Sequence, residues 1–191
     1  MPTGALIIIS GPSGAGKGTL VDRLVARVPG LWASVSATTR PPRPHEVEGD
    51  DYYFLSKDEF ARRIEAGEFL EWAEVHGNRY GTLASTVRKH MDAGLDVILE
   101  IDPQGAMQVK SLMPEAVLIF IIAPSMAELE RRIRARGAEN DEQIKTRLAT
   151  AVRELALVET YDHVVENDDV ARATDELAAI IASLRTGEGR S

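Results

Sequence analysis

Short, uninterrupted apolar runs recur along the chain and are separated by segments of helical periodicity. The runs Leu6–Ser10, Leu95–Ile101 and Val117–Ile122 contain few polar residues, as expected for strands covered on both faces. Apolar positions at helical spacing predict a first helix that contains Leu20 and Leu24 and ends at Pro29-Gly30. The same spacing predicts further helices over Gln104–Leu112, Met126–Arg136, Gln143–Glu159 and Ala171–Leu184. Strands that alternate with helices indicate an α/β fold with a doubly wound parallel sheet.

The segment from Ser34 to about Gly94 breaks this alternation. It contains short strand-like pieces and a single predicted short helix, which begins at Ser56 with Glu59 as capping partner and ends at Gly67. The strand-like pieces are Tyr52–Phe54, Phe69–Val75 and Arg79–Thr82. Because no crossover helix separates these pieces, we expect a small mixed sheet inserted into the parallel fold, in a position to hold a second substrate.

A glycine-rich run follows the first apolar strand directly. Its residues are Gly11, Pro12, Ser13, Gly14, Ala15, Gly16, Lys17, Gly18 and Thr19. The spacing of Gly11, Gly16 and Lys17 matches the P-loop, in which backbone N–H groups and a lysine surround the phosphates of a nucleotide. Gly18 stands where a Ser or Thr usually offers a hydroxyl to Mg²⁺, with Thr19 one place later. The structural alternative is a glycine-rich turn that only packs a helix on a strand.

Composition narrows the class of protein. With 191 residues, of which 44% are hydrophobic and 27% charged, the chain fits one globular domain. The net charge of -8 argues against a nucleic-acid partner, and phosphate binding must then rest on local basic clusters. Cysteine is absent, which excludes disulfides and thiolate chemistry. No secretion signal or membrane-spanning run is found, so a cytoplasmic location is expected, with no membrane partner and no obligate protein partner evident.

A second basic feature lies in the inserted segment. Arg40 and Arg43 flank a rigid proline turn, and an arginine fork binds phosphate with two parallel hydrogen bonds. Tyr52 and Tyr80 supply hydroxyl donors for the same phosphate. The alternative is a solvated loop, but a second phosphate site is favoured because the chain already contains a P-loop.

Several motifs, in order along the chain, resemble those of guanylate kinases. They are GPSGAGKGT at 11–19, SVSATTRPPRPHEVEGDDYYF at 34–54, EFLEWAEVHGNRYGT at 68–82, VILEIDPQG at 97–105, RRIRARG at 131–137 and END at 166–168. The resemblance covers nearly the whole chain. It implies transfer of the γ-phosphoryl group of Mg-ATP to GMP or dGMP, which gives ADP and GDP in purine metabolism. It also implies a single domain at 4–185 with a core at 1–33 and 95–191, a GMP-binding lobe at 34–94 and a helical lid at about 126–147.

The resemblance assigns the acceptor site to residues of the inserted lobe and of the strand end near Asp102. Glu71 is expected to accept the adjacent N1–H and 2-amino donors of guanine, which adenine lacks. The remaining GMP-binding residues are Ser36, Arg40, Arg43, Tyr52, Tyr80, Thr82 and Asp102. Without the resemblance, Glu71 would be interpreted as a surface acid in a hairpin. Its assignment to guanine depends on the guanylate kinase motif around it.

The resemblance also assigns the ATP site. Arg132, Arg136 and Arg147 are expected to join Lys17 in neutralising the transferred phosphoryl group, and Asn167 is expected at the adenine. Arg131 and Arg134 are interpreted instead as a solvated face paired with Glu128, Glu130 and Glu142. Glu100 and Asp102 end a predicted strand, where ligands of parallel sheets bind; Glu100 is expected to hold Mg²⁺ through water, with Thr19 as a second candidate. The structural alternative is that both acids cap the next helix.

Two other functions remain open at this stage. One is a P-loop kinase that acts on another phosphorylated small molecule, such as a different nucleoside monophosphate. The other is a non-catalytic interaction module with a guanylate-kinase-like fold, although such modules typically have degraded P-loops and here Gly11, Gly16 and Lys17 are all present.

Overall fold

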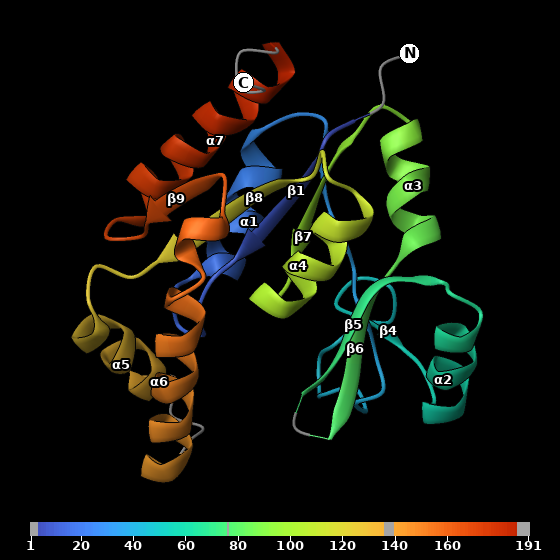
Figure 1. The fold of residues 1–191 in the computed structure, drawn as a ribbon, viewed down its shortest axis with the longest axis horizontal. Helices are drawn as coiled ribbons and strands as arrows, with labels where there is room; N and C mark the ends of the chain where they lie inside the picture. The colour runs from blue at the N-terminus through green and yellow to red at the C-terminus, as the bar shows by residue number, and fades with distance from the viewer. Residues whose placement is uncertain (1–3, 76, 136–139, 187–191) are drawn as a thin grey trace.

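Two sheets organise the computed structural model, which describes residues 4–75, 77–135 and 140–186 (Figure 1). The larger sheet is entirely parallel, and its five strands pair in the order β2-β7-β1-β8-β9. These strands are β2 (Leu31–Ala33), β7 (Asp96–Glu100), β1 (Leu6–Ser10), β8 (Val117–Ile122) and β9 (His163–Glu166). The central position of β1 follows from its sequence, because all five of its residues are buried.

Helices cover both faces of the parallel sheet. Side chains alternate along β1, so Ile7 and Ile9 face one layer while Leu6 and Ile8 face the other. The first layer contains α1 (Lys17–Arg27) and α7 (Val170–Thr186), and the second contains α3 (Ala84–Asp92) and α4 (Pro103–Leu112). The predicted doubly wound parallel sheet is therefore confirmed.

The smaller sheet lies at one end of the molecule, beside α2 (Figure 1). Its order is β4-β3-β6-β5, with one parallel pair and two antiparallel pairs, so it is the mixed sheet that the sequence predicts. Its elements are β3 (Ala37–Thr38), β4 (Tyr53–Phe54), α2 (Lys57–Glu65), β5 (Phe69–Val75) and β6 (Asn78–Leu83). Ser56 caps α2 as expected, since its hydroxyl accepts the Glu59 N–H at 3.1 Å.

The prediction of a single helix between Ser34 and Gly94 is wrong. A second helix, α3, lies in this segment, and its Ala84 and Val87 are buried against the parallel sheet. The helix has only nine residues, and its apolar positions are too few to show a clear period in the sequence.

Two helices, α5 (Met126–Ala135) and α6 (Asp141–Leu155), extend to one side of the parallel sheet (Figure 1), and Leu155 at the end of α6 packs against the sheet's core. They pack on each other through a small cluster of Leu129, Ile133, Ile144 and Ala151. The helix predicted to reach Glu159 ends earlier, and the 3-10 helix η1 (Val158–Thr160) follows it. Within the residues that the structure describes, no helix has the length and apolar character needed to span a membrane.

Candidate active site

The glycine-rich loop between β1 and α1 has the backbone geometry that its sequence predicts. Gly11, Gly14 and Gly16 all have positive φ, at 143°, 91° and 89°. A Cβ on Gly11 would stand 2.2 Å from the Ile121 carbonyl oxygen, so a side chain at this position would displace the loop from β8. Within the loop, the Ala15 N–H donates to the Pro12 carbonyl at 3.1 Å. The loop is thus held in one shape at the N-terminus of α1, where the helix dipole favours an anion.

Lys17 lies at the first residue of α1 and turns back over the loop. Its Nζ donates to the carbonyl of Gly11 at 2.6 Å and to that of Pro12 at 3.3 Å. The cavity in front of this loop has a volume of about 330 Å³. Its lining residues are Gly11, Ser13, Gly14, Gly16, Lys17, Gly18, Glu100, Ile101, Asp102 and Glu154. We call this space the P-loop cavity.

A second cavity, of about 200 Å³, opens beside the first and reaches into the smaller sheet. It is lined by Ser36, Tyr52, Glu71, Ala73, Val75, Tyr80, Gly81, Glu100, Ile101 and Asp102. We call it the lobe cavity. The two cavities share Glu100, Ile101 and Asp102, which run from the last residue of β7 to the N-cap of α4. Glu100 and Asp102 therefore lie at the carboxyl edge of the parallel sheet, as the sequence predicts; ligands of such sheets usually bind outside this edge.

Glu71 is the buried acid of the lobe cavity. Only 6% of it is exposed, and its Oε1 accepts the Thr82 hydroxyl at 2.7 Å. Burial raises the pKa of Glu71 from 4.5 to about 7; the Thr82 hydrogen bond opposes this rise and the charge of Asp102 adds to it. Burial destabilises the charged form of this carboxylate. A ligand that donates hydrogen bonds to it would therefore stabilise that form.

The arginines of the proline turn differ in their surroundings. The Arg40 guanidinium makes two hydrogen bonds to Glu46, at 2.8 and 3.0 Å, and lies 5.3 Å from the centre of the Tyr52 ring. The Arg43 N–H also donates to Glu46, at 2.7 Å. This role of Glu46 was not predicted from the sequence. The spacing could have indicated it, because Glu46 follows Arg40 by six residues and Arg43 by three. It orients Arg40 beside the tyrosine that lines the lobe cavity.

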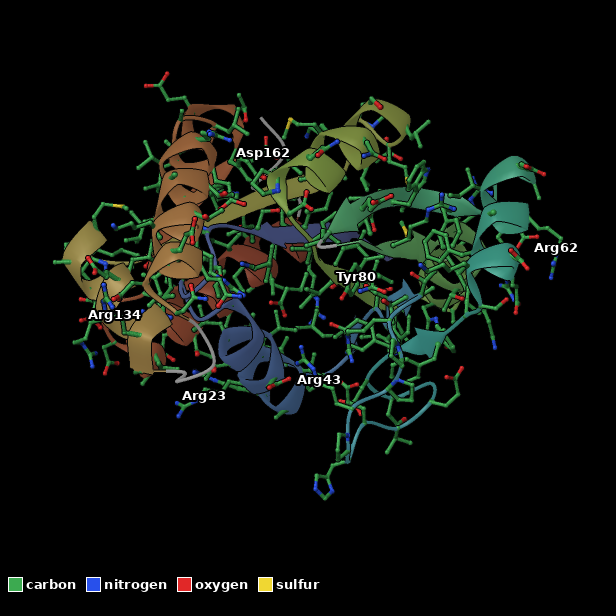
Figure 2. All side chains as sticks on the ribbon, turned by 90° about the horizontal axis from the view of Figure 1, so that it is seen from below. Arg23, Arg43, Arg62, Tyr80, Arg134 and Asp162 are labelled. Atoms are coloured by element: carbon green, nitrogen blue, oxygen red, sulfur yellow. The ribbon has the colours of Figure 1, made fainter. Side chains whose placement is uncertain are left out.

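The tyrosines of the lobe lie between the two ends of the molecule. Figure 2 shows Tyr80 near its middle, with Arg134 on α5 toward one end and Arg62 on α2 toward the other. The rings of Tyr52 and Tyr80 are 6.1 Å apart, edge to face. Burial raises the pKa of Tyr52, so its hydroxyl stays protonated and able to donate.

The chemistry next to Gly18 suits a magnesium ion. A Cβ on Gly18 would stand 3.5 Å from Oε2 of Glu100, so the missing side chain leaves that carboxylate next to the first turn of α1. Magnesium is typically bound through one or two carboxylates, several waters and the phosphates of the substrate. No group of three or more potential metal-ligating side chains occurs in the described part of the chain, which is compatible with such a site. Thr19, the second candidate, is exposed on α1.

The helices α5 and α6 bring arginine to the P-loop. Arg147 of α6 donates to the Ser13 hydroxyl at 2.8 Å, across 134 positions of sequence. Arg132 of α5 instead donates to Glu128 at 2.7 Å and to the Asn167 carbonyl at 2.9 Å. Arg136, the third predicted catalytic arginine, lies outside the described residues.

The interpretation of Arg131 and Arg134 as a paired surface is confirmed in most of its detail. Arg131 pairs with Glu128 and Arg134 with Glu130, both at salt-bridge distance along α5. The partner expected in Glu142 is replaced by Asp141, which accepts from Arg134 at 2.7 Å. Among the described arginines of α5 and α6, Arg147 is the one with a hydrogen bond to a P-loop side chain.

One acid in the P-loop cavity was missed from the sequence. Glu154 of α6 lines this cavity; burial raises its pKa, while the charge of Lys17 lowers it. It lies seven residues after Arg147, so both side chains project from the same face of α6. That spacing was the available signal.

Asn167 lies beneath the P-loop. It is 2% exposed, and its Nδ2 donates to the Ala15 carbonyl at 2.7 Å. A Cβ on Gly16 would stand 2.4 Å from that nitrogen, so the amide rests against the loop backbone. Asn167 thus supports the glycine-rich loop from below.

A parallel sheet with a P-loop at its carboxyl edge, a second cavity sharing one wall with it, and an arginine-bearing helix pair define a P-loop kinase of small phosphorylated substrates. The comparisons identify the family. The guanylate kinase family model matches residues 3–184. A guanylate kinase from Symbiobacterium thermophilum is 54% identical over 180 residues, which cover 94% of this chain and 85% of that protein. One from Rubrobacter xylanophilus is 51% identical over 187 residues, covering 98% of each.

A solved structure agrees with these sequences. The crystal structure of guanylate kinase from Anaplasma phagocytophilum has a TM-score of 0.80 and 34% identity, and the match covers 99% of this chain and 90% of that one. The chain belongs to the guanylate kinase family, and it is an enzyme of the nucleoside monophosphate kinase class.

Proposed function

We propose that the protein transfers the γ-phosphoryl group of Mg-ATP to GMP or dGMP, with ATP in the P-loop cavity and the acceptor nucleotide in the lobe cavity. The observation that carries this proposal is the shared wall of Glu100, Ile101 and Asp102 between the two cavities. In-line phosphoryl transfer requires donor and acceptor phosphates to meet at one point, and two adjoining cavities supply that point.

The lobe cavity has the groups that guanine requires. The Glu71 carboxylate, which already accepts from Thr82, would accept the N1–H and 2-amino donors, and Ser36, Thr82 and Asp102 would add polar groups near the base. Adenine offers no such donor pair, so it would leave the buried acid unsatisfied. Arg40, Arg43, Tyr52 and Tyr80 would bind the acceptor phosphate.

The P-loop cavity supplies the charge for transfer. The loop residues Gly11, Pro12, Ser13, Gly14, Ala15, Gly16, Lys17, Gly18 and Thr19 would surround the ATP phosphates, which would accept from backbone N–H groups of the loop other than Pro12, which has none, and from the Lys17 ammonium. Asn167 would lie beneath the loop and, we propose, near the adenine. Glu100 would hold Mg²⁺ through water, with Thr19 as the second candidate; the ion neutralises developing charge on the phosphates. No covalent intermediate is needed, because positioning and charge neutralisation suffice.

The division into parts completes the proposal. Residues 1–33 and 95–191 would form the core, 34–94 the GMP-binding lobe and about 126–147 the lid, which brings Arg132, Arg136 and Arg147 to the transferred group and excludes water. We also propose that the enzyme serves purine metabolism and acts in the cytoplasm.

Parallel acceptor assays test the proposal directly. Release of ADP from Mg-ATP is measured with GMP, AMP, CMP and UMP offered separately at equal concentration. Turnover with GMP alone is the expected result. Turnover with another of the four would favour a P-loop kinase of different specificity, and no turnover with any would favour a binding module.

Replacing Arg147 with alanine is expected to lower kcat by about 100-fold, because one of several cations at the transferred phosphoryl group is lost. The KM for GMP should change less than threefold, since Arg147 contacts the P-loop and not the lobe cavity. Arg153→Ala on the exposed side of α6 is the matched control and should leave kcat unchanged. Equal losses in both variants would assign the effect to the helix and not to Arg147.

A further inference from the structure

Helix α4 of the core packs along β5, the edge strand of the smaller sheet that carries Glu71. The Gln108 side chain of α4 pairs with the backbone of β5, as a neighbouring strand would at this open edge of the sheet. Its Oε1 accepts the Trp72 N–H and its Nε2 donates to the Trp72 carbonyl, both at 3.3 Å. Trp72 follows Glu71 directly, so the backbone next to the buried acid is tied to α4.

Gly105 stands one turn before Gln108 on the same helix and faces the acid itself. It is buried, and a Cβ built on it would lie 2.9 Å from Oε2 and 3.4 Å from Cδ of Glu71. A contact of 2.9 Å is closer than real Cβ atoms approach other atoms, so a methyl group here would press on the carboxylate. The N–H of Gly105 is occupied by Asp102, which accepts it at 2.8 Å as the cap of α4.

The two oxygens of Glu71 are therefore confined from different elements. Thr82 of β6 donates to Oε1, and the bare backbone of Gly105 lies against Oε2. A carboxylate that must accept two adjacent donors needs its plane fixed to within a few tenths of an ångström.

We infer that Gly105 is a positioning residue that sets the place of the Glu71 carboxylate, and that Gln108 holds β5 in register with it. The inference rests on the proposed role of Glu71 in guanine recognition. It makes guanine specificity depend on a glycine of α4 that is not among the residues lining the lobe cavity.

Gly105→Ala tests the inference. Alanine favours a helix more than glycine does, which offsets part of the cost of this close contact, so the variant should still fold, with a melting temperature near that of wild type. The KM for GMP should nevertheless rise about tenfold, with the KM for ATP changed less than twofold, since a small displacement of a binding group is costly. The ratio of kcat/KM for GMP to that for inosine monophosphate, which lacks the 2-amino donor, should fall.

Two further variants of α4 provide a control and a second test of the inference. Gln104→Ala changes an exposed side chain of the same helical turn and should leave both KM values unchanged. Gln108→Ala adds no atoms and should raise the KM for GMP severalfold, which keeps the test decisive if Gly105→Ala does not fold. A folded Gly105→Ala with unchanged KM for GMP, or with equal losses for both substrates, would overturn the inference.

Glu71→Gln separates this inference from the function on which it rests. A strong loss of GMP binding in Glu71→Gln beside a normal Gly105→Ala would refute the positioning role alone. An unaffected GMP preference in Glu71→Gln would refute the role of Glu71 and the inference together. If both assignments hold, the loss caused by Gly105→Ala should shrink in the Glu71→Gln background, because the two residues act on one contact.

Discussion

Lys17→Ala is expected to lower kcat by about 10³-fold, the largest loss of any single substitution in the P-loop, because a preorganised charge at the transferred phosphoryl group is removed. Lys17 Nζ donates to two carbonyls of its own loop, so the ammonium is held over the P-loop cavity before a nucleotide arrives. Without it, the phosphates would meet only backbone dipoles and the more distant arginines.

The fold should survive this substitution. Lys17 is partly exposed, and its removal leaves the positive-φ glycines and the support of Asn167 in place. The measurement is kcat from initial rates with Mg-ATP and GMP, together with thermal unfolding. Lys89→Ala, on the exposed side of α3, is the control and should match wild type in both. A rate for Lys17→Ala within a few-fold of wild type would contradict the assignment of the P-loop to catalysis.

Much of the fold could be predicted because its central strands are buried on both faces. Leu6–Ser10 and Val117–Ile122 are uninterrupted apolar runs, and both are observed as strands at those residues. The edge strands β2 and β9 could not be predicted in the same way. They have three and four residues with mixed burial, so neither shows a period.

The residues of the candidate site also differ in how far the sequence predicts them. Groups fixed by a local motif, such as Lys17 in its glycine-rich loop, could be assigned from sequence, since the spacing itself dictates the geometry. Contacts between distant segments could not. The hydrogen bond from Arg147 to Ser13 and the approach of Gly105 to Glu71 depend on how α6 and α4 pack, which no local pattern encodes.

Glu71→Gln is expected to raise the KM for GMP by about 10³-fold, because the charged acceptor is lost: one hydrogen bond is replaced by a contact between two donors, and the other is made to a neutral amide oxygen. Glutamine keeps the volume of the side chain and can still accept from Thr82, so the cavity should stay intact. Its NH₂ group would face a guanine donor, however, which leaves two donors unpaired. The KM for ATP should change little, and discrimination against AMP should be largely lost.

Glu74→Gln is the matched control, the same substitution three residues along the same strand at an exposed position. It should leave the KM for GMP unchanged. Equal effects of Glu71→Gln on GMP and AMP would favour a kinase that recognises a different base.

The pH dependence of GMP use provides a second test of the same residue. The pKa of Glu71 is raised to about 7 by burial, whereas guanine requires the carboxylate. Below pH 7 a proton must leave before GMP binds, so kcat/KM for GMP should rise with pH up to about 7 and level off above it. The phosphate of GMP also titrates, with a pKa of about 6, but it does so in both proteins. The difference between wild type and Glu71→Gln therefore isolates the acid.

Stability should respond with the opposite sign. The folded protein holds a proton on Glu71 at pH values where the unfolded chain, with a pKa of 4.5, has released it. This contribution to stability is present below pH 4.5 and is lost as the pH rises through about 7. Wild type should therefore lose stability relative to Glu71→Gln between pH 5 and pH 8, a range set by the same raised pKa. Thermal unfolding curves that do not diverge over this range would contradict the raised pKa of Glu71 in the folded protein. If stability falls and kcat/KM for GMP rises over the same range, and both changes are absent in Glu71→Gln, one buried carboxylate controls base recognition and is destabilising until GMP binds.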